Sequence, residues 1–141
     1  MKKILLLLMA CAGLLACFGD DNENVADTPI ELTQGNLQGT WVLNAKYFSG
    51  ERQELTICEK LELWSFSDNI VNAHFGYRFN NRDACSEIDK TYFFTLENEG
   101  INIYTEDNLS VTPIRVFNFT SKKLVLGTDG NSERKEYIKQ E

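Results

Sequence analysis

The chain is poor in the residues on which most catalytic and metal sites depend. It contains one histidine, His74, which the surrounding alternation of apolar residues turns toward solvent, and it has no Gly-x-Ser-x-Gly turn. It also has no calcium-binding loop and no glycine-rich phosphate cradle. We therefore expect a non-enzymatic protein with no cofactor and no bound metal.

Basic residues are scarce relative to acidic ones. The chain has 14 Lys and Arg against 21 Asp and Glu, a net charge of −7. Nucleic-acid binding depends on clustered basic side chains, so nucleic acid is not an expected partner. Some of the acids are candidates for paired acid–base work, but they fall on expected turns or outward positions, and we interpret them as solvated: Glu59, Glu62, Asp83, Glu87 and Asp89.

No apolar run reaches the roughly 20 residues that span a bilayer, but a short one stands near the beginning of the chain. Lys2 and Lys3 precede apolar residues from Ile4 to Leu15, a pattern typical of a bacterial export signal. Leu14-Leu15-Ala16 then leads directly into Cys17. The pattern predicts a signal peptide over residues 1–16.

A Cys directly after Leu-Leu-Ala resembles the lipobox of bacterial lipoproteins. In that family the Cys thiol takes a diacylglyceryl group, the peptide is cut before the Cys, and the new amino terminus is acylated, commonly with palmitate. The resemblance implies lipidation of Cys17, and Cys11 is a poorer candidate because it would leave a very short apolar segment. Cleavage removes two lysines and no acid, which leaves 12 basic and 21 acidic residues, a net charge of −9. Attachment to the membrane must then come from acyl chains. An ordinary signal peptide with a chance Cys is the alternative.

Residues 17–38 read as a lipidated, acidic and flexible tether, because few large apolar residues interrupt Asp, Glu, Asn, Gly and Thr. The cluster Gly19-Asp20-Asp21-Asn22-Glu23 resembles the surface-export signal of Bacteroidota lipoproteins. A solvated spacer would explain the same residues. We expect a lipid anchor in the bacterial outer membrane, with surface exposure slightly favoured over a periplasm-facing position.

Residues 39–141 suffice for one small domain, and their apolar residues recur with a period of two. Such alternation, rich in aromatic and β-branched residues and separated by turn residues, predicts an all-β domain. We expect eight antiparallel strands, over residues 40–48, 59–66, 70–79, 91–97, 100–105, 112–119, 123–128 and 133–139. They can close into an up-and-down barrel or split into a sandwich, and closure has the advantage of removing exposed edges.

Aromatic residues dominate the positions expected to face inward: Trp41, Tyr47, Trp64, Phe66, Phe75, Tyr77, Phe79, Tyr92, Phe94 and Tyr137. An eight-stranded barrel is just wide enough to be filled by side chains or to hold one small ligand. A filled core is the first expectation. The hypothesis to test is a cup at one mouth for a small hydrophobic ligand, lined by Phe75, Tyr77, Tyr92 and Phe94. Alternation leaves Phe48, Phe93, Tyr104 and Val125 outside, where convergence would make a contact patch.

The segment Gly35-Asn36-Leu37-Gln38-Gly39-Thr40-Trp41-Val42-Leu43 resembles the opening Leu-x-Gly-x-Trp-x-Leu of lipocalin-like lipoproteins of Bacteroidota. The pattern around Leu63-Trp64-Ser65-Phe66 and the closing Phe117-to-Leu126 segment fit as well. The resemblance implies an eight-stranded, lipocalin-like β-barrel with Trp41 at its closure. Thr91-Tyr92-Phe93 departs from the second Gly-x-Trp of many relatives. Arg134 and Lys139 are the candidates to cover the Trp41 indole by cation–π stacking.

Cys58 and Cys85 are the internal thiols that remain after processing. Proteins in oxidising compartments rarely leave such a pair unjoined. A hairpin turning at Asp68-Asn69 would bring the start of the second expected strand beside the end of the third. We predict a disulfide, because the alternative zinc site wants four ligands and the chain has one histidine.

The leading hypothesis is a non-enzymatic, membrane-anchored lipoprotein that binds a small apolar ligand or acts as a surface interaction module. The alternative is an accessory lipoprotein with a filled barrel that binds a protein or glycan of an outer-membrane complex. An enzyme or enzyme inhibitor has the least support.

Overall fold

The computed structural model describes residues 28–79, 84–106 and 111–141. Within these residues nine strands form one antiparallel sheet in the order β2-β1-β3-β4-β5-β6-β7-β8-β9, and β1 also pairs with β9. The elements are α1 (Gln34–Leu37), β1 (Gly39–Phe48), β2 (Glu51–Gln53), the 3-10 helix η1 (Glu59–Leu61), β3 (Leu63–Ser67), β4 (Ile70–Tyr77), β5 (Ser86–Glu97), β6 (Gly100–Tyr104), β7 (Val111–Phe119), β8 (Lys123–Gly127) and β9 (Glu133–Lys139).

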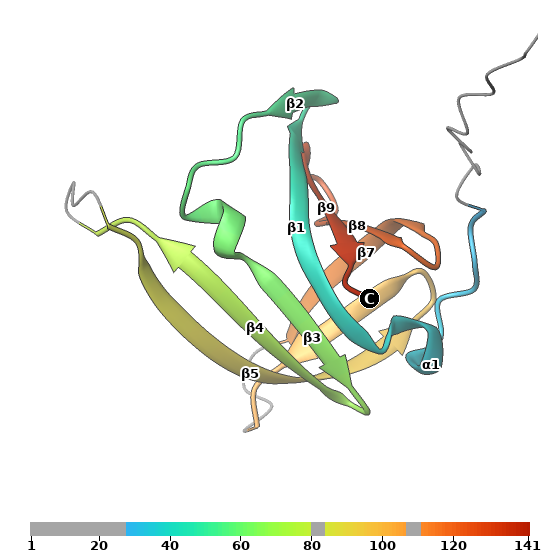
Figure 1. The fold of residues 1–141 in the computed structure, drawn as a ribbon. Helices are drawn as coiled ribbons and strands as arrows, with labels where there is room; N and C mark the ends of the chain where they lie inside the picture. The colour runs from blue at the N-terminus through green and yellow to red at the C-terminus, as the bar shows by residue number, and fades with distance from the viewer. Residues whose placement is uncertain (1–27, 80–83, 107–110) are drawn as a thin grey trace, which may run out of the picture.

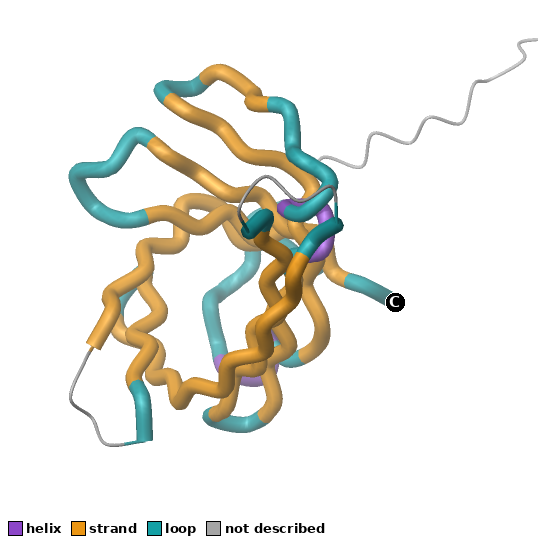
Figure 2. Tube along the Cα trace, turned by 90° about the vertical axis from the view of Figure 1, so that its left-hand side faces the viewer, coloured by secondary structure: helices purple, strands orange, loops and turns teal. Residues whose placement is uncertain are grey.

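The pairing of β1 with both β3 and β9 closes eight of the described strands into a barrel, while the short β2 lies beside β1. Figures 1 and 2 show the strands winding around a common interior. This confirms the predicted antiparallel barrel and excludes the sandwich.

The short β2 was not expected, and two of the eight expected strands differ most from their ranges. The second begins as η1 and becomes β3 only at Leu63, and β5 begins at Ser86, five residues before the expected start at Thr91. Residues 87–91 are exposed, so they carry no burial alternation that a sequence pattern could reveal. Their strand conformation comes instead from the ladder to β4, where Phe75 lies opposite Ile88.

One end of the barrel, the closed end, is covered by α1. Leu37 is fully buried there, and the Ile30 amide donates a hydrogen bond to the Phe119 carbonyl at 2.9 Å. The side chains of Ile30 and Leu32 pack against the core. The folded unit therefore begins before residue 39, where the sequence placed its boundary, and residues 17–27 of the expected tether lie outside the described residues.

Trp41 seals the closed end from inside. Its indole is fully buried and donates a hydrogen bond to the Leu37 carbonyl at 2.8 Å. The Lys139 ammonium lies 5.1 Å from the centroid of the indole, so Lys139 is the cation that covers Trp41. Arg134, the other candidate, lies over Phe117 on the outer wall, 3.5 Å from the ring centroid.

The core fills the closed half of the barrel. Trp41 contacts Phe119 with ring centroids 5.8 Å apart, and Phe66 meets Phe94 edge to face at 5.2 Å. The buried cluster consists of Leu37, Trp41, Leu43, Trp64, Phe66, Val71, Ala73, Phe94, Ile101, Ile103, Phe119, Leu124, Leu126 and Tyr137. Two residues expected inside, Tyr77 and Phe79, are instead 44% and 53% exposed, because β4 runs out past the end of the barrel core there.

The predicted disulfide between Cys58 and Cys85 is confirmed, with Cα atoms 5.4 Å apart. It joins the residue that precedes η1 to the residue that precedes β5, and the Cys58 end lies directly on β4. A Cβ at Gly76 would come within 2.4 Å of the Cys58 carbonyl oxygen and 2.9 Å of the Leu61 side chain. Only glycine allows this close approach, so the disulfide and Gly76 together fix η1 against the barrel.

Replacing both cysteines, as Cys58→Ser with Cys85→Ser, should lower the free energy of unfolding. The bond closes a loop whose ends are 27 residues apart, which corresponds to about 3.5 kcal/mol in the chain-entropy treatment. Urea unfolding followed by tryptophan fluorescence measures this loss. Wild-type protein reduced with dithiothreitol should match the double variant, and equal midpoints for the variant and the oxidised wild type would contradict the prediction.

Candidate functional site

A cavity of about 230 Å³ lies at the other end of the barrel, the open end. Its aromatic walls are Trp64, Phe75 and Tyr137, and its aliphatic walls are Ile114 and Leu126. The remaining lining residues are polar or small: Glu62, Thr112, Gly127, Thr128, Asn131, Glu133 and Lys135. We call this space the mouth cavity.

A β-bulge in β1 decides which side chains reach the open end. The ladder between β1 and β9 pairs Leu43 with Tyr137, shifts by one residue, and then pairs Lys46 with Lys135. Residues directly opposite one another share a face, so Lys46 lies on the same interior face as Lys135. Strict alternation would have placed Tyr47 there, and its predicted inward orientation is wrong for this reason.

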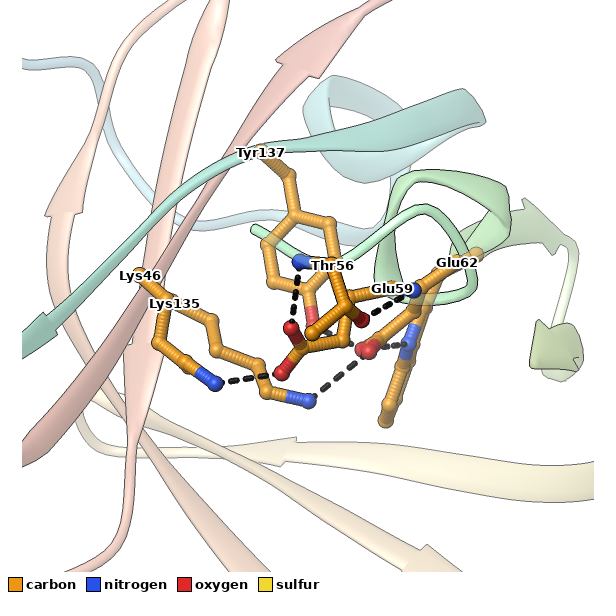
Figure 3. A network of polar contacts seen from close by, with 7 residues as sticks. Lys46, Thr56, Glu59, Glu62, Lys135 and Tyr137 are labelled. Carbon is orange, nitrogen blue, oxygen red and sulfur yellow. Dashed lines mark hydrogen bonds and ion pairs between the residues drawn. The ribbon is translucent and has the colours of Figure 1, made fainter. Parts of the chain in front are cut away.

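Two glutamates neutralise the two lysines. Lys46 forms an ion pair with Glu59 of η1, and the Lys135 ammonium lies 2.8 Å from the Glu62 carboxylate. Figure 3 shows both lysines reaching toward these carboxylates. Like charges opposite each other on neighbouring strands repel, so the glutamates make the pairing of Lys46 with Lys135 tolerable.

Glu62 is the centre of this polar network. It is only 5% exposed, and it accepts hydrogen bonds from the Tyr137 hydroxyl at 2.5 Å and from the Trp64 indole at 3.4 Å, besides its contact with Lys135. A buried carboxylate costs several kcal/mol unless it is paired and hydrogen-bonded. The three side chains that contact the Glu62 carboxylate also line the mouth cavity: Tyr137, Trp64 and Lys135.

The Tyr137 hydroxyl is held in its protonated, donating form. Burial raises the pKa of Tyr137 well above its ordinary value, and the negative charge of Glu62, which accepts the hydrogen bond, raises it further. Tyr137 therefore remains a hydrogen-bond donor to Glu62 throughout the physiological pH range.

The neighbouring ion pair, between Lys46 and Glu59, also keeps both of its charges. The hydrogen bond to Glu59 raises the pKa of Lys46 above its ordinary value. Burial alone would raise the pKa of Glu59, but hydrogen bonds from Lys46 and from the Thr56 amide, at 2.9 Å, outweigh it and lower that pKa. Both groups are therefore charged at neutral pH.

The four residues expected to form a ligand cup are not gathered around one space. Phe75 lines the mouth cavity, but Phe94 belongs to the filled core and Tyr92 packs half-buried against that core. Tyr77 is exposed at the end of β4. The cause is the course of β4 and β5, which carries Phe75 along the cavity wall but Tyr77 beyond it.

The interpretation of the acids as solvated is wrong for Glu62. Glu62 lies two residues before Trp64 and four before Phe66, so alternation alone would have placed it inward with them. Among the other candidates, Glu59 is half-buried, while Asp89 and Glu87 contact His74 at 2.7 and 3.4 Å on the outer wall. Asp83 and the lipidation site Cys17 lie outside the described residues.

A larger hollow of about 810 Å³ lies along the outer wall, lined mainly by the turn residues 97–100 and by Arg115 and Asp129. It adjoins the mouth cavity at Thr112, Ile114 and Thr128, because the β7 ladder to β8 begins only at Arg115. We take the smaller space as the candidate site, since three aromatic side chains and the buried Glu62 line it.

Residues 28–79, 84–106 and 111–141 contain no cluster of three or more side chains able to ligate a metal ion. In the same ranges no helix has the length and apolarity needed to cross a membrane.

Tyr137→Phe should change how stability depends on pH. Because the pKa of Tyr137 is higher in the folded protein than in the unfolded one, its contribution to stability is complete below the unfolded pKa of about 10. That contribution is lost as the pH rises from there toward the folded pKa. At pH 7 the variant should lose about 1.5–3 kcal/mol, the contribution of a hydrogen bond to a charged group, and the gap to wild type should narrow above pH 10. Urea midpoints at pH 7, 9.5 and 11 test this.

Tyr104→Phe is the matched control, because Tyr104 stacks on Phe93 on the outer wall and has no contact with Glu62. A gap between Tyr137→Phe and wild type that stays constant up to pH 11 would contradict the role assigned to Tyr137.

Comparison with known proteins places this geometry in a family. The family model described as a lipocalin-like domain matches residues 37–126. A lipocalin-like protein from Bacteroides uniformis superposes with a TM-score of 0.56 and 12% identity, over 75% of this chain and 100% of that one. An uncharacterized protein from Bacteroides eggerthii superposes with a TM-score of 0.54 and 13% identity, over 73% of this chain and 98% of that one. At identities this low, the two structures show only that they have the same fold as this chain. No curated protein matches the chain significantly. Because the family match spans more than half of the sequence, the chain belongs to the lipocalin-like domain family, whose barrel suggests the binding of a small ligand.

Proposed function

We propose that this chain is a non-enzymatic bacterial lipoprotein, anchored by acyl chains on Cys17, whose barrel binds a small, largely apolar molecule in the mouth cavity. The observation that carries the proposal is the contrast between the two barrel ends. Side chains fill the closed end around Trp41, whereas the open end keeps a cavity of about 230 Å³ with three aromatic walls.

The lining of the mouth cavity matches a ligand with an apolar body and one polar group. Trp64, Phe75, Ile114 and Leu126 supply apolar surface, and the buried carboxylate of Glu62 stands among them. Ligand sites generally combine such walls with a few placed polar groups that fix orientation. The cavity lies below the roughly 300–1,000 Å³ of sites for drug-sized molecules, so the ligand is compact.

The direction from which the chain enters the barrel supports a water-accessible mouth. Residues 28–37 reach the fold at the closed end, where Ile30 bonds to Phe119 and α1 covers the core. For a chain anchored at Cys17, the link to the membrane would therefore join the described fold at the closed end, and it would leave the open end free for a ligand from the aqueous phase. The acidic cluster Gly19-Asp20-Asp21-Asn22-Glu23 supports a position on the cell surface.

A surface interaction module is the second candidate. Phe93 and Tyr104 stack on the outer wall with centroids 5.9 Å apart and planes 20° from parallel. Such a pair would suit a protein or glycan of an outer-membrane complex. The other outward residues do not join it, since Phe48 lies at the open-end rim, where it pairs with Glu133, and Val125 pairs with Glu136.

Native mass spectrometry of the full chain, purified gently from its own host, tests ligand binding. We expect a co-purifying small molecule that is lost on organic extraction. The Phe75→Trp substitution fills the cavity. If it abolishes the bound mass, the mouth cavity is the binding site. An apo mass under all gentle conditions, together with crosslinked protein partners on intact cells, would favour the interaction module.

Cys17→Ser should abolish anchoring, because the hydroxyl cannot take the diacylglyceryl group. The variant should lose incorporation of an alkyne fatty acid and disappear from the outer-membrane fraction, as measured by click labelling and membrane fractionation. Cys11→Ser is the matched control and should keep both properties. Retained labelling in Cys17→Ser would contradict the anchor.

A further inference from the structure

We propose that the mouth cavity selects a compact organic cation, such as a small quaternary or primary amine. The inference rests on the proposed function, because it names the chemistry of the molecule that the same cavity binds. Three features carry it: the arrangement of the aromatic walls, an unpaired carboxylate, and the engagement of both lysines.

The aromatic rings form walls in different planes. The Trp64 ring meets Phe75 at 87° and Tyr137 at 62°, with centroids 6.2 and 6.3 Å apart, and all three line the mouth cavity. The faces of aromatic rings carry partial negative charge and attract cations, most strongly where water is excluded. Rings set at angles around one space can contact a cation from several sides, as aromatic cages for quaternary ammonium groups do.

The charges on the wall sum to a negative value. Glu62, Glu133 and Lys135 are the charged residues that line the mouth cavity among those described. Lys135 pairs with Glu62, whereas the carboxylate of Glu133 has no hydrogen bond or ion pair within the described residues. Lys46 and Glu59, behind them, neutralise each other. The five groups therefore sum to one net negative charge, in a chain whose net charge is −7. The carboxylate of Glu133 is close enough to Lys46 to attract it, although the two form no ion pair.

An anionic ligand would have to disrupt this arrangement. It would need Lys135, which holds the 5% exposed carboxylate of Glu62. Drawing Lys135 away would leave a buried carboxylate without its cation, which is strongly unfavourable. Recruiting Lys46 would also break its ion pair with the half-buried Glu59. A cation instead adds a partner for Glu133 and leaves both existing pairs intact.

Isothermal titration calorimetry on the full chain in a non-ionic detergent tests this with three probes of similar shape. Choline carries the positive charge, its carbon analogue 3,3-dimethylbutan-1-ol is neutral, and 3,3-dimethylbutanoate is negative. We expect choline to bind about tenfold more tightly than the alcohol, a ratio in line with a desolvated cation–π contact. The carboxylate probe should bind least.

Two variants test the assigned residues. Glu133→Gln should weaken choline binding about five- to tenfold and leave binding of the alcohol unchanged, since the amide keeps the shape and removes the charge. Phe75→Leu should weaken choline more than the alcohol, because it removes a ring and keeps an apolar wall. The matched control is Glu31→Gln, which makes the same charge change at an exposed position at the closed end and should have no effect.

The outcomes separate the two proposals. If the alcohol or the carboxylate binds as tightly as choline, or if Glu31→Gln and Glu133→Gln weaken choline equally, the inference about the cation is overturned while a small-ligand function stands. If none of the three probes binds, and benzylamine, benzyl alcohol and benzoate also fail, both the inference and the binding of a compact ligand in this cavity are overturned.

Discussion

The ladder between β1 and β9 is the constraint on which the rest of the structure depends, because it converts a meander into a closed barrel. The same ladder makes the two ends of the barrel different. Before the bulge, alternation places Trp41 and Leu43 inside, where they join the filled core under α1. After it, the inward position falls to Lys46 opposite Lys135. The one extra residue in β1 thus makes the barrel interior apolar at the closed end and polar at the open end.

The polar open end is hard to explain by stability alone. Buried ion pairs are often no more stabilising than well-packed apolar residues of similar size. An apolar replacement for Glu62 and Lys135 would let the open end fill as the closed end does, yet the chain keeps two lysines and two glutamates there. The proposed small-molecule site would account for this, because Glu62 holds Tyr137, Trp64 and Lys135 in fixed positions around a space that they leave open. The disulfide and Gly76 serve the same end, since they fix η1, which carries Glu59.

Much of this fold can be read from the sequence. Period-two alternation is a direct consequence of strand geometry, so it located most strands, and the oxidising context predicted the disulfide between Cys58 and Cys85. The start of β5 was missed because residues 87–91 are exposed and depend on β4 for their conformation. The site was predicted only in part. Phe75 was among the expected residues, but the inward turn of Lys46 depends on a bulge that leaves no pattern in the sequence. Glu62 was missed although it alternates with Trp64, because an acid is ordinarily assigned to solvent.

The most direct test of the central claim, an open end that binds a small molecule and a closed end that does not, uses the two tryptophans. Trp64 lines the mouth cavity, and Trp41 is fully buried in the closed end. Their indole N–H groups give separate signals in a ¹H–¹⁵N correlation spectrum of the full chain. On titration with choline the account predicts a saturable shift of the Trp64 signal and no change in that of Trp41. A Trp41 signal that moves as far as that of Trp64 would contradict it, as would Trp64 and Trp41 signals that both stay in place with choline, its two analogues and the three benzyl probes.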